Sequence, residues 1–208
     1  MVRTTFVAFV ATVTGLAATA IAEPTVVFQD GPGTTQGGIY RAFSSDHGNF
    51  ETFCLEMGEG MTFDVPFEYT IGTDIKFNGN NTVNPLDSES AFLYTMFRED
   101  RIRDILGKPN LPEAALADAV QLALWNIEWD NATNNQDALA LIQAAADAIA
   151  NGEWSGLGLV RVMGVWNPGH VGEQGHGKQD VLVIIPLPSA AGLATAGVLA
   201  LVAARRRI

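Results

Sequence analysis

The chain has 208 residues, of which 48% are hydrophobic and 17% are charged, and its formal net charge is −11 at pH 7. This composition is too apolar for a disordered chain, and the length suits one domain or at most two. The acidic balance argues against nucleic acid as a partner, because nucleic-acid binding needs a basic surface. The single cysteine, Cys54, excludes an internal disulfide framework and a cysteine-rich zinc site.

Residues 1–22 are typical of a signal peptide. A basic start at Arg3 is followed by an uncharged apolar run, which ends in a small-x-small sequence at Ala22, before Glu23. We therefore predict export, with cleavage after Ala22. An uncleaved N-terminal anchor is the alternative, because the uncharged run would nearly span a bilayer.

The exported part, residues 23–185, reads as one α+β domain with a mostly antiparallel β core. Its eight basic and 23 acidic residues leave a net charge of −15, which keeps such a surface soluble and repels polyanions. Runs rich in β-branched and aromatic residues predict strands before and after a helical insert. The expected strands are 25–30, 49–56, 67–71, 74–77, 159–166 and 180–185, and the expected helices are 88–106, 112–130 and 135–150.

Residues 186–208 have the three parts of a C-terminal sorting signal. Pro186, Leu187 and Pro188 precede an apolar stretch, 189–204, and Arg205, Arg206 and Arg207 follow it. As a helix the stretch would be roughly 24 Å long, which is shorter than the ~30 Å hydrocarbon core of a bilayer. The segment resembles a PEP-CTERM signal with leucine in place of the usual glutamate. That resemblance implies a membrane-inserted precursor and a membrane protease that removes the tail near Pro188; an ordinary tail anchor is the alternative.

Gln121 is the polar residue of interest in the second predicted helix. At 100° per residue, Leu116, Val120 and Leu124 form the core-facing stripe, and Gln121 lies on its shoulder with Trp125 one turn later. We expect this glutamine to be partly sheltered without lying in the core. On the helix alone, a boundary glutamine bonded to backbone is the simpler interpretation, and Cys54 alone could be a small buried hydrophobe.

The sequences around these two residues resemble the thioester domains of bacterial surface proteins. Phe53-Cys54-Leu55-Glu56 is similar to that family's aromatic-Cys-x-Glu strand, and VQLALW at 120–125 to its apolar-Gln-x-Ala-x-Trp segment. The glycine-rich stretch 30–38 also resembles the start of such domains. The resemblance implies an internal thioester with Cys54 as the sulfur donor and Gln121 as the acyl donor. Phe53, Trp125 and Trp129 are candidates for aromatic walls that keep water from it.

The resulting hypothesis is an adhesin-like protein of the cell surface or extracellular matrix. An amine or hydroxyl on a partner protein or polysaccharide would attack the Gln121 carbonyl, and the Cys54 thiolate would leave. This is single-turnover attachment and not enzyme catalysis, and it implies no cofactor and no metal. His170 and His176 lie six residues apart in a glycine-rich loop, where we expect a solvated loop because the sequence indicates no complete coordination shell.

Two other classes of protein stay open. A cysteine-nucleophile enzyme would need His47, with Asp46 or Glu56, as the base or orienting group for Cys54. A passive structural or carbohydrate-binding matrix protein could use Trp154 and Trp166 as sugar platforms, although tryptophan is more often core or boundary.

Overall fold

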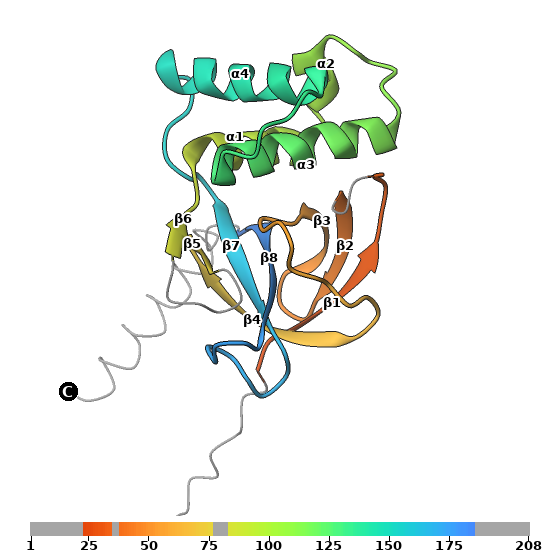
Figure 1. The fold of residues 1–208 in the computed structure, drawn as a ribbon, viewed down its shortest axis with the longest axis vertical. Helices are drawn as coiled ribbons and strands as arrows, with labels where there is room; N and C mark the ends of the chain where they lie inside the picture. The colour runs from red at the N-terminus through yellow and green to blue at the C-terminus, as the bar shows by residue number, and fades with distance from the viewer. Residues whose placement is uncertain (1–22, 35–37, 77–82, 186–208) are drawn as a thin grey trace, which may run out of the picture.

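The computed structural model describes residues 23–34, 38–76 and 83–185 (Figure 1). The predicted signal peptide and sorting tail lie outside these residues. Within the described part of the chain, no helix is long and apolar enough to cross a membrane.

Six strands form one antiparallel sheet in the order β3-β2-β1-β4-β7-β8. A second, two-stranded sheet pairs β5 with β6. The strands are β1 (Thr25–Asp30), β2 (Ile39–Ser44), β3 (Gly48–Phe53), β4 (Pro66–Gly72), β5 (Asp74–Lys76), β6 (Val83–Pro85), β7 (Val160–Trp166) and β8 (Gly177–Ile184).

The large sheet curls until its two edge strands meet. Directly after β3, Cys54 forms an antiparallel bridge with Val181 of β8. The Leu55 N–H donates to the Asp180 carbonyl at 2.9 Å, and the Thr52 hydroxyl donates to the Leu182 carbonyl at 2.6 Å. These bonds satisfy backbone groups that an open sheet edge would leave unpaired.

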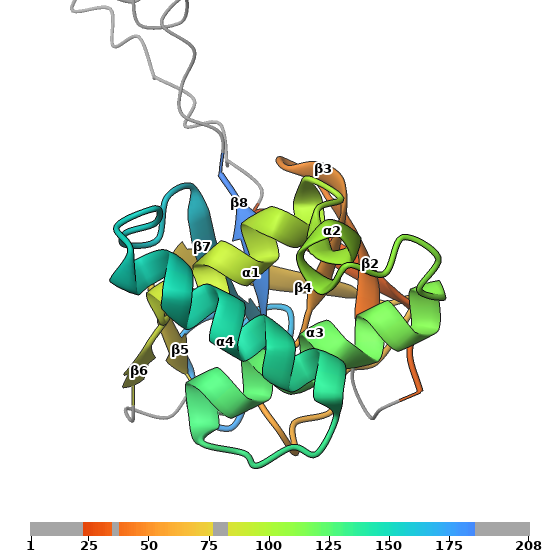
Figure 2. The same ribbon diagram turned by 90° about the horizontal axis from the view of Figure 1, so that it is seen from above.

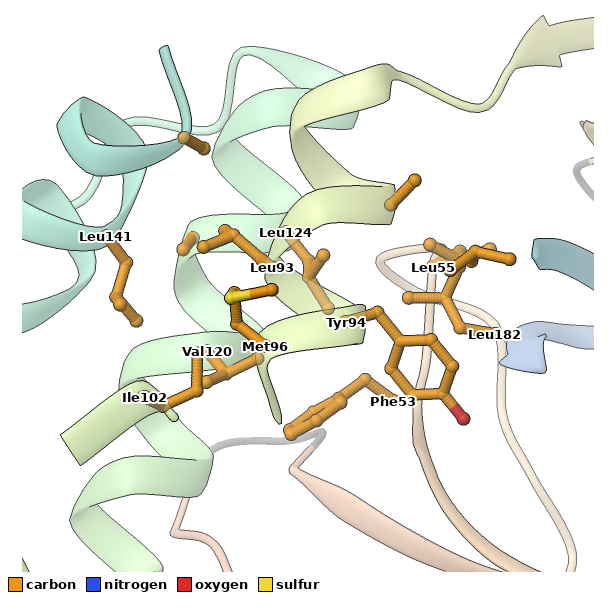
Figure 3. Close-up of a cluster of buried hydrophobic side chains, with 14 of the residues drawn as sticks. Phe53, Leu55, Leu93, Tyr94, Met96, Ile102, Val120, Leu124, Leu141 and Leu182 are labelled. Carbon is orange, nitrogen blue, oxygen red and sulfur yellow. The ribbon is translucent and has the colours of Figure 1, made fainter. Parts of the chain in front are cut away.

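Alternation along the strands divides the buried side chains between two clusters. One cluster fills the inside of the curled sheet and includes Phe28, Tyr40, Cys54 and Val181, with Trp125 of a helix added to it. The other cluster lies between the sheet and the helices and contains Phe53 and Leu55. Figure 3 shows this second cluster, in which Phe53, Leu55 and Leu182 meet helix side chains such as Tyr94 and Leu124.

The helices form a layer at one end of the sheet, inserted between β6 and β7 (Figure 1). Seen from above in Figure 2, α4 lies across α1 and α3, and it contacts both. Asn135 caps α4 by accepting from two backbone N–H groups of its first turn. The helices are α1 (Ser88–Arg98), α2 (Ile102–Leu106), α3 (Glu113–Trp129) and α4 (Gln136–Ala150).

The predicted α+β class with a largely antiparallel sheet is confirmed, but three elements differ from the prediction. The short strand β6 (Val83–Pro85) lies where no strand was predicted. Residues 39–44 form β2, which was not predicted, although Tyr40 and Ala42 are buried while Arg41 between them is exposed. The single helix expected at 88–106 is broken into α1 and α2. The break falls at Asp100, whose φ of 56° is left-handed and cannot continue a right-handed helix.

The packing of α3 gives a first prediction. Leu124 is fully buried between the sheet and the helices, whereas Leu139 on α4 is exposed. We expect Leu124→Ala to lower the free energy of unfolding by about 2–5 kcal/mol, because it removes buried methyl groups and leaves a cavity. Leu139→Ala, the matched control, should change it by less than about 0.5 kcal/mol. Urea denaturation measures both, and equal losses would contradict this packing.

Candidate functional site

The structure brings Cys54 and Gln121 together. Cys54 follows β3 at the closure of the sheet, and Gln121 lies in the middle of α3; neither has any exposed surface. The Cys54 Sγ donates to Gln121 Oε1 at 3.1 Å. Because a carbonyl bond is about 1.2 Å long, the sulfur lies within about 4.3 Å of the amide carbon Cδ. Residues 67 positions apart thus place a thiol beside a primary amide.

Two backbone groups fix the orientation of the Gln121 amide. Its Nε2 donates to the Cys54 carbonyl at 2.8 Å, and the Gly38 N–H donates to its Oε1 at 3.1 Å. The Gly38 N–H therefore points at the oxygen on which negative charge develops when a nucleophile attacks Cδ. Together with the bond from Sγ, the Gln121 amide makes three hydrogen bonds, so both its Oε1 and its Nε2 are held in place.

A glycine is required at position 38. Its φ is +116°, and a Cβ there would lie 2.9 Å from the Pro32 carbonyl oxygen. Thr34 is also bound to α3, about one turn before Gln121, where its N–H donates to Asp118 Oδ1 at 2.7 Å. The Gly38 conformation thus helps to set where its N–H points.

The expectation that Gln121 is only partly sheltered was wrong. On a helical wheel at 100° per residue, the buried residues of α3 cover about two thirds of the circumference, in an arc that has Ala119 at one end and Trp125 at the other. The helical wheel assumed one apolar stripe facing one surface. In the structure α4 packs on α3 from one side, and the strand end at Cys54 and Gly38 cover the other.

The predicted aromatic surroundings divide between the two sides of the strand. Trp125 is 6% exposed and shares the inner cluster with Cys54. Trp129 is 36% exposed, and its Nε1 donates to the Leu55 carbonyl at 2.7 Å. Phe53 points away from the inner cluster and toward the helices, because neighbouring residues of a strand face opposite sides. Its ring packs edge-on against that of Phe97, with the ring centroids 4.8 Å apart.

Tyr40 is a site residue that sequence reasoning missed. Burial raises the pKa of the Cys54 thiol to about 12, and the neighbouring Tyr40 hydroxyl, which donates to Gln179 Oε1 at 3.4 Å, opposes this rise. Burial, and next the nearby Cys54, raise the pKa of Tyr40 as well. Both groups are therefore neutral at physiological pH. The signal that could have found Tyr40 is the alternation of β2, which turns its side chain toward Cys54.

Glu56 is buried two residues after Cys54. Its Oε2 accepts from the Asp180 N–H at 2.5 Å, and the Gln179 side chain donates to its backbone carbonyl. Burial first, and then the neighbouring Asp180 carboxylate, raise the pKa of Glu56 far above its usual range. The carboxyl is therefore protonated at neutral pH.

A cavity of ≈ 530 Å³ lies near the pair, and its lining includes Leu122, the neighbour of Gln121 in the sequence, and Glu56, two residues after Cys54. Two of its lining residues, Glu56 and Trp125, each have a buried polar atom without a hydrogen-bond partner within the described structure: Oε1 and Nε1. A protonated carboxyl and an indole N–H are both donors, so a ligand oxygen entering here would find two unoccupied partners. The cavity is lined by Glu56, Met57, Gly58, Glu59, Gly60, Leu122, Trp125, Asn131 and Gln179.

The histidine and the tryptophans of the two other classes lie away from the pair. His47 precedes β3 and is seven residues from Cys54, about 23 Å along an extended strand, and its ring lies against Tyr69. It therefore forms no thiol–imidazole pair with Cys54. Trp166 is 3% exposed and offers no platform to a sugar. Trp154 is half-buried, with its ring edge-on to Phe92.

Comparison with protein-family models finds no match for this chain, and neither the curated proteins nor the solved structures that were compared contain one. A functional assignment therefore has to come from the residues and geometry of the chain itself. The Cys54–Gln121 pair is the feature of that geometry with the most specific chemistry.

The buried carboxyls predict how stability depends on pH. Burial raises the pKa of Glu128 to about 7 and raises those of Glu56 and Asp180. The folded state thus keeps protons that the unfolded state releases above about pH 4, so stability falls as pH rises from there. We expect a higher melting temperature at pH 5.5 than at pH 8, by about 2–4 °C for each kcal/mol by which the free energy of unfolding differs between the two.

Glu56→Gln tests the part of this effect that belongs to the site. The amide keeps an acceptor for the Asp180 N–H but does not titrate, so the melting temperature should depend less steeply on pH. Exposed Glu153→Gln is the matched control and should leave the slope unchanged. Both are best compared in a Cys54→Ala background, which removes chemistry at the thiol. An unchanged slope in Glu56→Gln would show that this carboxyl is ionised in the folded protein.

Proposed function

We propose that Cys54 and Gln121 form an internal thioester, with which the domain attaches itself covalently, once, to a nucleophile on a surface partner. The observation that carries the proposal is the 3.1 Å contact between the single thiol and a fully buried glutamine side chain. The amide is held at both ends by backbone groups, as a reaction of a fixed pair requires.

Formation of the bond converts a thiol and an amide into a thioester and ammonia. The Cys54 sulfur bonds to Gln121 Cδ, negative charge gathers on Oε1, and the Gly38 N–H stabilises it. The Cδ–Nε2 bond then breaks, and the thiol proton leaves with the nitrogen as part of ammonia. Fixing the two groups in position supplies up to roughly 7–11 kcal/mol of the barrier, which an amide and a thiol in water would lack.

Use of the bond reverses the role of the sulfur. An amine or hydroxyl attacks Cδ, the C–S bond breaks, and the proton of the nucleophile ends on the Cys54 sulfur. The Tyr40 hydroxyl, which donates to Gln179 Oε1 in the structure, would turn to support the departing thiolate, which burial otherwise disfavours. The cavity at Glu56 and Trp125 is the route we assign to the nucleophile, because its lining includes Leu122, next to Gln121, and Glu56, two residues after Cys54.

The setting we propose is the cell surface or extracellular matrix. The supporting features are the N-terminal segment ending at Ala22 and the PEP-CTERM-like tail from Pro186 to Arg207. We infer a processing protease as the partner of the tail, and a protein or polysaccharide nucleophile as the partner of the domain.

One observation favours a second candidate, a non-covalent carbohydrate-binding or structural matrix protein. A separate cavity of ≈ 670 Å³ is lined by polar and aromatic side chains that include Asp46, Asn49, Phe50 and Trp154. Such a mixture of stacking and hydrogen-bonding groups suits a sugar. This function needs no bond between Cys54 and Gln121, so the state of that pair separates the two candidates.

Intact mass is the decisive measurement. We expect the purified protein to be lighter than its sequence by one ammonia, and methylamine to add its full mass. Cys54→Ala and Gln121→Ala should each abolish both effects while leaving a folded protein. Gln121→Glu should abolish them too, because a thiolate does not displace the oxygen of a carboxylate under these conditions. Full mass, together with a thiol that iodoacetamide modifies as readily in the refolded as in the denatured protein, would rule the thioester out.

Tyr40→Phe tests the proposed support of the thiolate. The ring and its packing remain, but the hydroxyl near Cys54, which donates to Gln179 Oε1, is lost. We expect at least a several-fold slower reaction with methylamine, because thiolate departure loses its hydrogen bond. Tyr69→Phe is the matched control: Tyr69 is as buried as Tyr40, at 5% exposed, but its hydroxyl bonds Ser44. Equal rates in the two variants, measured by mass spectrometry over time, would remove Tyr40 from the mechanism.

A further inference from the structure

The connection between β7 and β8 is built from three successive turns. The His170 N–H donates to the Asn167 carbonyl, the Glu173 N–H to the His170 carbonyl, and the His176 N–H to the Glu173 carbonyl. Each turn thus begins where the previous one ends. The Asn167 N–H donates to the His176 carbonyl at 3.0 Å and closes the loop at the base of the strands. In Figure 1 this loop lies at the end of the sheet away from the helices.

A three-residue glycine repeat produces these turns. Gly169, Gly172 and Gly175 have φ values of 78°, 80° and 84°, and each is the third residue of its turn. A type II turn requires a positive φ at that position, which glycine adopts without strain. The residue after each glycine is therefore placed equivalently in every turn. Those residues are His170, Glu173 and His176.

The repeat gathers three potential metal ligands on one loop. Ligand atoms of His170, Glu173 and His176 all lie within 4.8 Å of one another. The His170 Nδ1 is 2.7 Å from Glu173 Oε2, and the two imidazole rings stack with centroids 3.8 Å apart. In the sequence only the two histidines indicate a metal ligand set, since their carboxylate partner is identified by the period of the turns and not by a known motif.

We propose that His170, Glu173 and His176 form a binding site for a divalent transition-metal ion, best suited to Zn²⁺. Two imidazoles and one carboxylate are a ligand set that zinc commonly uses, with a fourth position left to water or another ligand. Small side-chain rotations bring three donors from this spacing to the ~2.0–2.2 Å bonds of zinc. The acidic domain surface, with a net charge of −15, also attracts cations to the loop.

Bound zinc would tie together the start, the middle and the end of the loop. His176 directly precedes β8, and the Gly169 N–H donates to Glu68 of β4 at 2.9 Å. The ion would therefore stabilise the folded state, because the unfolded chain holds no such ligand set together.

Zinc titration of the tag-free, chelator-treated protein tests the site. Isothermal calorimetry with ZnCl₂ at pH 7.5 should give one ion per chain, and zinc should raise the melting temperature. His170→Ala and His176→Ala should each weaken binding at least tenfold, and Glu173→Gln should weaken it measurably. The remaining histidine supplies the control: His47→Ala should bind as the unchanged protein does.

The possible outcomes are distinct from those of the thioester test. Cys54→Ala should keep full zinc affinity, because that side chain lies inside the curled sheet and not on the loop. Absence of stoichiometric binding would overturn the proposal. So would binding that persists when His170 and His176 are both replaced by alanine, provided that circular dichroism shows a folded variant.

Discussion

The bridge between Cys54 and Val181 is the constraint on which the site depends. It joins the two edge strands of the sheet and so fixes the position of the cysteine backbone. The carbonyl of the same residue then holds the Gln121 amide, so one residue closes the sheet, orients the amide and carries the sulfur. A small shift at this closure would therefore act on the stability of the sheet and on the geometry of the pair together.

Burial has opposite consequences for the two halves of the proposed chemistry. It keeps water away from a bond that hydrolysis would destroy, but it also raises the pKa of the thiol to about 12 and disfavours the nucleophilic thiolate. Fixed geometry has to compensate for this low thiolate population. The three hydrogen bonds of the Gln121 amide, one from the Gly38 N–H, one to the Cys54 carbonyl and one from the thiol, are the means that the fold provides.

The sequence predicted most of the regular structure, because its patterns are local. The boundaries of α3 and α4 follow from Pro112 and Asn135 at their starts, and the strands β1, β4 and β7 from runs of β-branched and aromatic residues. Strand β2 was missed because glycines before it were interpreted as part of a loop. The burial of Gln121 could not be predicted from its helix, since it depends on a strand end and on Gly38, both distant in the sequence.

Glycines with positive φ explain why both candidate sites were incompletely predicted. In a sequence such residues indicate turns, and a turn is ordinarily assigned no chemistry. Yet at Gly38 the conformation aims a backbone N–H at Gln121 Oε1, and at Gly169, Gly172 and Gly175 it repeats a turn that aligns three ligands. In each case the glycine contributes no functional side chain and instead determines where other groups point. A glycine repeat whose period matches that of titratable residues is therefore a pattern that indicates a site, even where no established motif is present.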